Sequence, residues 1–145
     1  MSGNKRIDAH WTFWAIGGVA LIWNILGIVN FVMQMNAGVL AAMPPSHRSI
    51  VEGRPLWATI GFAIAVFGGA LGCVLLLLRQ QAAYYLFIAS LLGVMAQLIH
   101  TLRVAAATDG FTPLDLVMIV LMPLLVAAFL IWYSTQAGPK GVRPE

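Results

Sequence analysis

Four long runs of apolar residues follow one another along the chain, at residues 11–35, 57–78, 82–102 and 114–133. Each run is close to the roughly 20 residues that a helix needs to cross the hydrocarbon core of a bilayer. None shows the strict alternation of apolar and polar positions that is typical of a barrel strand. A helix also satisfies its own backbone hydrogen bonds in hydrocarbon. The pattern therefore predicts an all-α integral membrane protein, a bundle of four helices in a single domain.

The connections between the runs differ in length. Only residues 79–81 separate the second run from the third, which predicts an antiparallel hairpin. Residues 36–56 form the longest connection, with a mildly apolar segment before Pro44 and a candidate N-cap at Ser46 for a short helix. We expect this connection to lie on the outer surface of the membrane, as a lid or an interfacial element.

Three amide side chains interrupt the first apolar run, those of Asn24, Asn30 and Gln34. At about 100° per residue they fall within one arc of about 120° of the helix. An amide that faced lipid would lose its hydrogen bonds to water without gaining others. We therefore expect this side of the helix to face protein.

The third run carries a second polar face, formed by Ser90, Gln97 and His100. The first and third runs cross the membrane in the same direction, so their later residues reach the same level, where Asp115 begins the fourth run. These groups are expected to converge in a buried polar seam or an outward-facing cavity. The predicted seam consists of Asn24, Asn30, Gln34, Ser90, Gln97, His100 and Asp115.

Two interpretations of the seam remain open. Hydrogen bonds between amides and hydroxyls of neighbouring spans stabilise membrane helices by about 0.6 kcal/mol on average, so the polar groups could serve packing alone. The alternative is a pocket for a polar substrate. For His100 and Asp115 the choice is between simple solvation or ion pairing at the interface and a role in proton coupling or ligand contact.

Small residues predict where helices approach each other closely. Gly61, Gly68 and Gly72 recur along one side of the second run, and Gly93 lies on the polar face of the third. Gly68 and Gly72 form a GxxxG pair, a common contact between membrane helices. We expect this pair to meet a second copy of the chain. Pro123 should kink the fourth run.

The composition supports this picture, since 61% of the 145 residues are hydrophobic and only 9% are charged. With four spans both termini share one side of the bilayer, and five basic residues fall there against three opposite. This bias predicts cytoplasmic N and C termini. The two groups are Lys5, Arg6, Arg79, Lys140 and Arg143 on the side of the termini, and Arg48, Arg54 and Arg103 on the other.

Several function classes find no support in the sequence. No nucleophile lies near a base at helical spacing, and no span holds paired carboxylates, so an enzyme is not expected. His10, His47 and His100 fall in separate regions and the methionines on different helix faces, so we expect neither a metal site nor a cofactor. No basic stripe with interleaved aromatics indicates nucleic acid.

Several short segments between about Trp11 and Tyr133 form a pattern: Trp23-Asn24, Gly27, Asn30-Phe31, Gln34, Pro55-Leu56-Trp57-Ala58, the residues from Val66 to Gly72, Leu75-Leu76-Leu77-Leu78-Arg79, Ser90-Leu91-Leu92-Gly93, Met122-Pro123 and Trp132-Tyr133. In these segments the chain resembles a group of small bacterial inner-membrane proteins with four spans. Members of that group often carry the label "sugar transporter". The resemblance implies the fold and a location in the bacterial inner, or cytoplasmic, membrane.

Two functional hypotheses follow. In the first, the protein is a transporter of a small polar solute that works in the lipid bilayer as a homodimer or larger homo-oligomer. In the second, it is a non-transporting accessory or assembly subunit, whose polar stripe docks onto the spans of a larger membrane partner.

Overall fold

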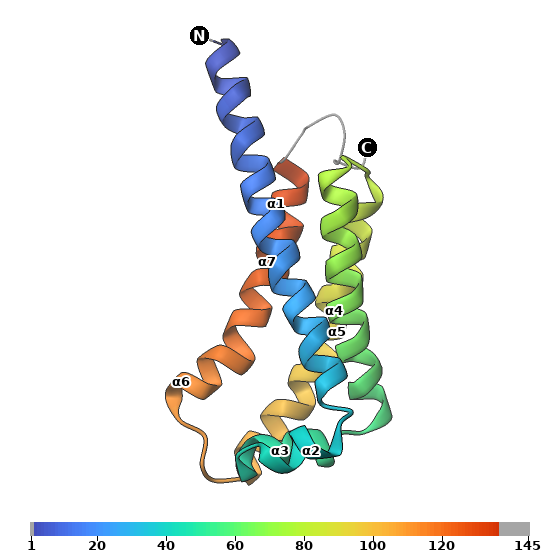
Figure 1. Cartoon of the computed structure of the whole chain (residues 1–145), viewed down its shortest axis with the longest axis vertical. Coiled ribbons are helices and arrows are strands. Elements are labelled where there is room, and N and C mark those ends of the chain that lie inside the picture. The colour runs from blue at the N-terminus through green and yellow to red at the C-terminus, as the bar shows by residue number, and fades with distance from the viewer. Residues whose placement is uncertain (1, 137–145) are drawn as a thin grey trace.

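The computed structural model describes residues 2–136, with side chains from Trp11 onward. The side chains of Lys5, Arg6, Lys140 and Arg143, on which the predicted orientation depends, lie outside this part. The described chain is helical and contains no strand (Figure 1). Its elements are α1 (Ser2–Met33), α2 (Ala37–Ala42), α3 (Pro45–Glu52), α4 (Leu56–Leu77), α5 (Ala82–Ala107), α6 (Pro113–Leu116), the π-helical turn η1 (Val117–Leu121) and α7 (Met122–Gln136).

Four helices are long and apolar enough to cross a membrane, which confirms the predicted all-α four-helix bundle. The spans are Trp11–Met33, Leu56–Leu77, Ala82–Ala107 and Pro113–Gln136, the last one formed by α6, η1 and α7 together. The third span continues past residue 102 to Ala107. This extension ends in three consecutive alanines, which favour helix strongly.

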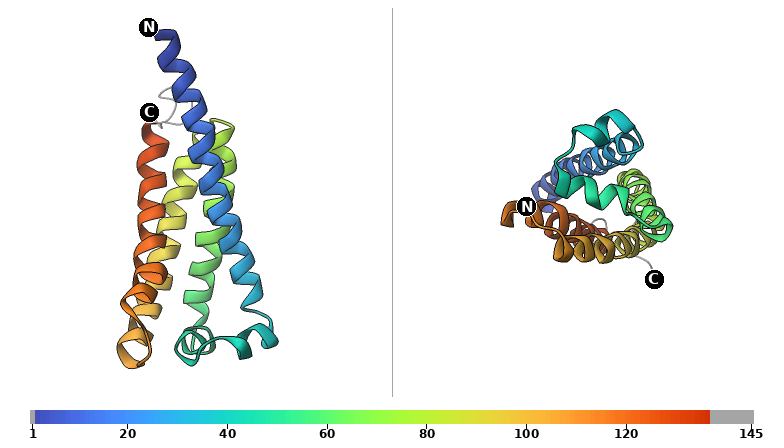
Figure 2. Two further views of the ribbon diagram at one scale, coloured as in Figure 1. Left: turned by 60° about the vertical axis from the view of Figure 1, so that its left-hand side comes forward. Right: turned by 90° about the horizontal axis from the view of Figure 1, so that it is seen from below.

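The spans pack in the order α1, α4, α5 and α7 (Figures 1 and 2). We call the end of the bundle where α2 and α3 lie the α3 end, and the opposite end, with the turn between α4 and α5, the Arg79 end. At the Arg79 end α1 meets α7, where the rings of Phe13 and Tyr133 stack with centroids 6.4 Å apart. Toward the α3 end α1 and α7 diverge (Figures 1 and 2).

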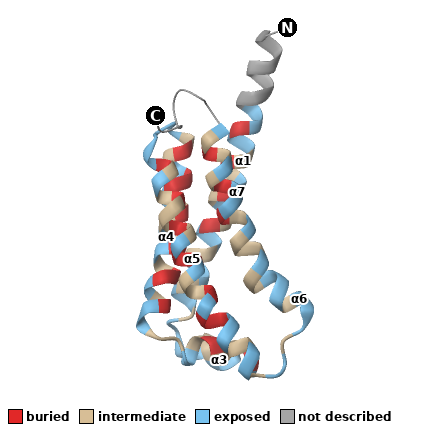
Figure 3. Cartoon of the chain, turned by 180° about the vertical axis from the view of Figure 1, so that it is seen from behind, coloured by how far each residue is buried: buried red, intermediate tan, exposed pale blue. Residues whose placement is uncertain are grey.

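A compact apolar core closes the bundle at the Arg79 end. Phe13, Leu76, Phe87 and Leu130 bring all four spans together there and are almost fully buried. The outward faces of the spans stay exposed (Figure 3), as expected for surfaces that contact lipid. The packing is therefore tight at one end of the bundle and open at the other.

The turn at Arg79 joins α4 to α5 as the predicted hairpin. Arg79 adopts a left-handed backbone conformation with a φ of 58°, which is uncommon for a residue with a side chain. The turn is closed by the N–H of Gln80, which donates to the carbonyl oxygen of Leu75 at 2.9 Å, a pattern that satisfies the end of a helix. The Arg79 guanidinium lies 4.2 Å from the centroid of the Phe13 ring, so the turn also contacts α1.

Glycines let α4 and α5 approach closely. A Cβ on Gly93 would meet the carbonyl oxygen of Gly61 and would lie 2.8 Å from the backbone nitrogen of Ala65. A Cβ on Gly72 would lie 2.7 Å from the Phe87 ring, and Gly68 also faces α5. The expectation that Gly68 and Gly72 meet a second copy is wrong, because α5 of the same chain covers this face.

The long connection folds into α2 and α3, which lie across the α3 end of the bundle (Figure 2). Asn36 caps α2, since its Oδ1 accepts hydrogen bonds from the N–H groups of Gly38 and Val39 at 2.8 and 3.2 Å. The predicted N-cap role of Ser46 is wrong. The helix α3 begins one residue earlier, at Pro45, whose missing N–H is no loss at a first helical position.

Arg48 ties α3 to α2. Its guanidinium donates to carbonyl oxygens at the C-terminal end of α2, where the last turn leaves acceptors free. The acceptors are the oxygens of Leu40 at 3.1 Å, Ala41 at 2.7 Å and Met43 at 3.0 Å. The two short helices are therefore fixed to each other as one cover.

The fourth span is irregular in its first half. Residues Val117–Leu121 wind as a π-helical turn, and the N–H of Met122 bonds to the carbonyl oxygen of Val117. Pro123 follows directly and has no N–H to donate to the preceding turn. The irregularity predicted at Pro123 thus takes the form of a π turn just before it, and this turn directs the start of the span away from α1 (Figure 1).

Candidate functional site

A cavity of about 690 Å³ lies between the four spans, next to α3. Its size falls within the roughly 300–1,000 Å³ of small-molecule sites in proteins. Along α1 its lining residues extend from Trp23 to Gln34, a length of roughly 16 Å at the rise of an α-helix. All of its walls come from one chain.

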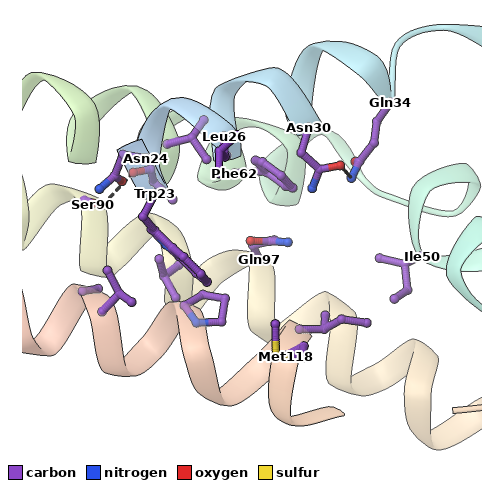
Figure 4. Close-up of a pocket in the computed structure, with 18 of the residues that line it drawn as sticks. Trp23, Asn24, Leu26, Asn30, Gln34, Ile50, Phe62, Ser90, Gln97 and Met118 are labelled. Atoms are coloured by element: carbon purple, nitrogen blue, oxygen red, sulfur yellow. Dashed lines mark hydrogen bonds between the residues drawn. The ribbon is translucent and has the colours of Figure 1, made fainter. Parts of the chain in front are cut away.

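Six of the seven residues of the predicted seam line this cavity. The helical periodicity of the first and third runs indicated which sides of α1 and α5 they share, and the structure brings these sides together (Figure 4). Their participation in binding stays a prediction. The six are Asn24, Asn30, Gln34, Ser90, Gln97 and Asp115.

The deep polar residues are engaged in helix packing. The Nδ2 of Asn24 donates to the carbonyl oxygen of Ala20 at 2.9 Å and contacts the Cys73 sulfur at 3.6 Å. The hydroxyl of Ser90 donates to the carbonyl oxygen of Ala65 at 2.7 Å, which links α5 to α4. For these two residues the geometry favours the packing interpretation.

The polar residues nearer the α3 end form a chain that ends in a cation. The Nε2 of Gln34 donates to the Oδ1 of Asn30 at 3.3 Å, and Arg54 donates from Nη2 to the Oε1 of Gln34 at 2.6 Å. The Arg54 guanidinium lies 5.0 Å from the centroid of the Phe62 ring. Its Nε is buried and has no hydrogen-bond partner among the described residues. Burial lowers the pKa of Arg54 from its ordinary value.

Gln97 projects from α5 into the middle of the cavity, between Trp23 and Met118 (Figure 4). Its backbone carbonyl accepts a hydrogen bond from Thr101 at 3.1 Å. In the described part of the chain its side-chain amide has no such bond, in contrast to the amides of Asn24 and Gln34. The Gln97 amide is therefore the polar group most available to a bound molecule.

His100 does not line the cavity, which corrects the expectation that it belongs to the seam. It is buried, and its Nε2 lies 2.9 Å from the carbonyl oxygen of Ile50 near the C-terminal end of α3. The periodicity of α5 placed it on the right side of the helix, but α3 covers that position. His100 thus holds α3 against α5 and positions the cover of the cavity.

Asp115 lies at the rim, on the wall formed by α6. Its Oδ2 accepts a hydrogen bond from the N–H of Thr112 at 2.9 Å, and Thr112 caps the helix in return. Its Oδ1 lies 3.8 Å from the Nε2 of His47, whose ring packs against Phe111 with centroids 5.5 Å apart. The carboxylate is therefore already engaged by two neighbours.

Among the lining residues that sequence reasoning missed are Trp23, His47 and Arg54. His47 and Arg54 belong to the connection between the first two spans, where no periodicity indicates the direction of a side chain. Trp23 lies directly beside Asn24, so the helical arc of the amides was the signal that could have identified it.

The site has the features of a binding pocket. The described residues contain no group of three or more His, Cys, Asp or Glu side chains that could hold a metal ion. Its walls are mostly apolar. Its polar groups include the Arg54 cation, whose Nε has no hydrogen-bond partner among the described residues, and the side-chain amide of Gln97. The fold and the cavity define a multi-pass membrane protein with an internal pocket. In comparisons with protein families, curated proteins and solved structures, none matches this chain.

Proposed function

We propose that the protein is a small membrane carrier, which binds a molecule with polar groups in the cavity and moves it across the bilayer. The observation that supports this most is the cavity itself. A chain that only docked onto a partner would have no need of an internal pocket, and dry packing of the four spans would bury more surface.

The difference between the two ends supports a carrier in one of its two states. The core around Phe13 and Leu130 closes the Arg79 end, whereas the cavity lies toward the α3 end. With cytoplasmic termini, as the basic residues predict, the cavity faces outward. The π turn and Pro123 interrupt the fourth span beside the cavity, and such interruptions are common where membrane helices bend during transport.

A location in the bacterial inner membrane, which the resemblance noted in the sequence implies, is part of this proposal. The cavity changes one part of the transport hypothesis. Because all four spans of one chain contribute to its lining, a second copy is not needed to form the binding site. A homo-oligomer stays a prediction, to be tested on the purified protein.

Uptake by the purified protein in liposomes tests the proposal. The liposomes would be exposed to a defined mixture of sugars, amino acids, carboxylic acids and phosphate esters, washed, and analysed by mass spectrometry beside protein-free liposomes. We expect at least one compound to enter only with the protein. Gln97→Ala should reduce its uptake, because the amide projects into the cavity, whereas Leu92→Ala, at a position of α5 that is 61% exposed, should not.

The accessory hypothesis predicts a different outcome. Liposomes with the protein would take up none of the compounds, and cross-linking in native membranes would capture a larger membrane protein at the outward faces of α1 or α7. That combination would overturn the carrier proposal.

A further inference from the structure

Among the side chains that the structure describes, none is a counter-ion for the Arg54 cation. Within the described residues the one contact between a basic and an acidic side chain is that of His47 with Asp115, at 3.8 Å, and it does not involve Arg54. The partners of Arg54 are the neutral oxygen of Gln34 and the ring of Phe62, and its Nε is buried without a partner. A guanidinium offers five N–H donors in a planar fork that fits a carboxylate or a phosphate. The α3 end of the cavity therefore has donors and a positive charge to offer to an anion.

The rest of the cavity suits an apolar group. From Arg54 the cavity extends toward the Arg79 end as far as Phe87 and Leu130. Most of its lining residues are apolar. Asn24 and Ser90, the polar residues at that depth, already bond to neighbouring backbone. A molecule with its charge at Arg54 would thus extend an apolar body into the bundle.

The cavity also has a lateral opening toward the bilayer. Leu26 on α1 and Met118 on η1 both line it, although 60% and 51% of their surfaces are exposed. These residues lie on the two spans that diverge toward the α3 end (Figure 2). A molecule dissolved in one leaflet could enter between them without first leaving the membrane.

Together these features identify a class of ligand. We propose that the cavity binds an amphipathic anion, with its carboxylate or phosphate group on Arg54 and Gln34 and its apolar chain along Trp23 and Phe62. The inference rests on the proposed function, because it names the class of molecule that the carrier takes. The Asp115 carboxylate does not oppose this, since it lies on the other wall and is engaged by Thr112 and His47. The Gln97 amide, which projects into the same cavity, offers a further hydrogen bond to a polar group of the ligand.

Binding of radiolabelled dodecyl phosphate tests the inference, with the full chain in nanodiscs of phosphatidylcholine and empty nanodiscs subtracted. We expect saturable binding, with weak competition from dodecanol, dodecyltrimethylammonium and inorganic phosphate. Arg54→Gln should weaken binding about tenfold or more, the usual effect of losing a hydrogen bond to a charged group. Arg103→Gln, at an exposed arginine on α5, should change nothing.

Arg54→Lys guards against a trivial loss of folding, because it keeps the charge. It should bind more tightly than Arg54→Gln but less tightly than the wild type, since a lysine lacks the planar fork. Thermal unfolding of each variant in the same nanodiscs would show that the binding data refer to folded protein.

The possible failures are distinct. If dodecanol or dodecyltrimethylammonium binds as tightly as dodecyl phosphate and Arg54→Gln has no effect, the ligand is not an anion. If inorganic phosphate competes as well as dodecyl phosphate, the ligand is a free anion and the amphipathic part is wrong. The absence of saturable binding for every probe would overturn the whole inference, whereas the carrier proposal is decided separately by uptake from the solute mixture.

Discussion

The contact between α4 and α5 can be tested at a single atom. In Gly93→Ala the new Cβ would meet the carbonyl oxygen of Gly61 and would lie 2.8 Å from the backbone nitrogen of Ala65. Both neighbours are backbone, so no side-chain rotation can relieve the contact and the two helices must separate. Such overpacking lowers the free energy of unfolding by about 1–3 kcal/mol. Alanine returns about 1 kcal/mol through its higher helix propensity. We therefore expect a net loss of up to about 2 kcal/mol, and a stability about 1–3 kcal/mol below that of a glycine-to-alanine variant without the steric contact.

Unfolding by SDS in mixed micelles, followed by far-UV circular dichroism, measures this difference. Two other glycines serve as matched controls. A Cβ on Gly18 would meet no atom within 4 Å, and one on Gly68 would make contacts of ordinary length, the nearest at 3.6 Å. Alanine at either position should leave stability unchanged or raise it slightly. Equal stability of Gly93→Ala and Gly18→Ala would refute the reasoning, because the close approach of α4 and α5 would then not exist.

Three further predictions concern single side chains. Ser90→Ala removes the bond to the Ala65 carbonyl oxygen and should lower the free energy of unfolding by about 0.6 kcal/mol; a loss above about 2 kcal/mol would contradict a simple packing role. His100→Phe leaves the carbonyl oxygen of Ile50 without its partner, so we expect a loss of about 1–3 kcal/mol and faster hydrogen exchange in α3; unchanged exchange would show that His100 does not hold the cover. A cysteine in place of the exposed Gln80 should react with a membrane-impermeant maleimide only from the cytoplasmic side, and labelling from outside would reverse the predicted orientation.

The spans and their polar faces could be predicted because they depend on local rules. Length and composition suffice to identify a membrane helix, and a period of 3.6 residues indicates which side chains share a face. Asn30 and Gln97 were expected on facing sides of α1 and α5 for this reason alone, and both line the cavity. Whether they face each other across packed side chains or across a pocket depends on packing between helices, which periodicity does not report.

What the sequence did not reveal depends on tertiary contacts. Arg54 lies in an irregular connection, and its direction is set by Phe62 and Gln34, which are distant from each other along the chain. The Gly68 and Gly72 pair predicted a close helix contact but could not specify the partner, because GxxxG serves contacts within a chain and between chains equally. His100 had the correct helical face, yet α3 covers that position and removes it from the cavity.

The central claim is that Gln97 projects into a cavity that α2 and α3 cover only in part at the α3 end. The direct measurement is the reaction rate of Gln97→Cys with a membrane-impermeant thiol reagent added outside intact cells, in a background where Cys73 is replaced by serine. Leu92→Cys, on the lipid-facing side of the same helix, is the control. We predict that Gln97→Cys reacts from outside and Leu92→Cys does not. If both cysteines are unreactive although the protein is folded, the polar side chains line no accessible cavity and the account is contradicted.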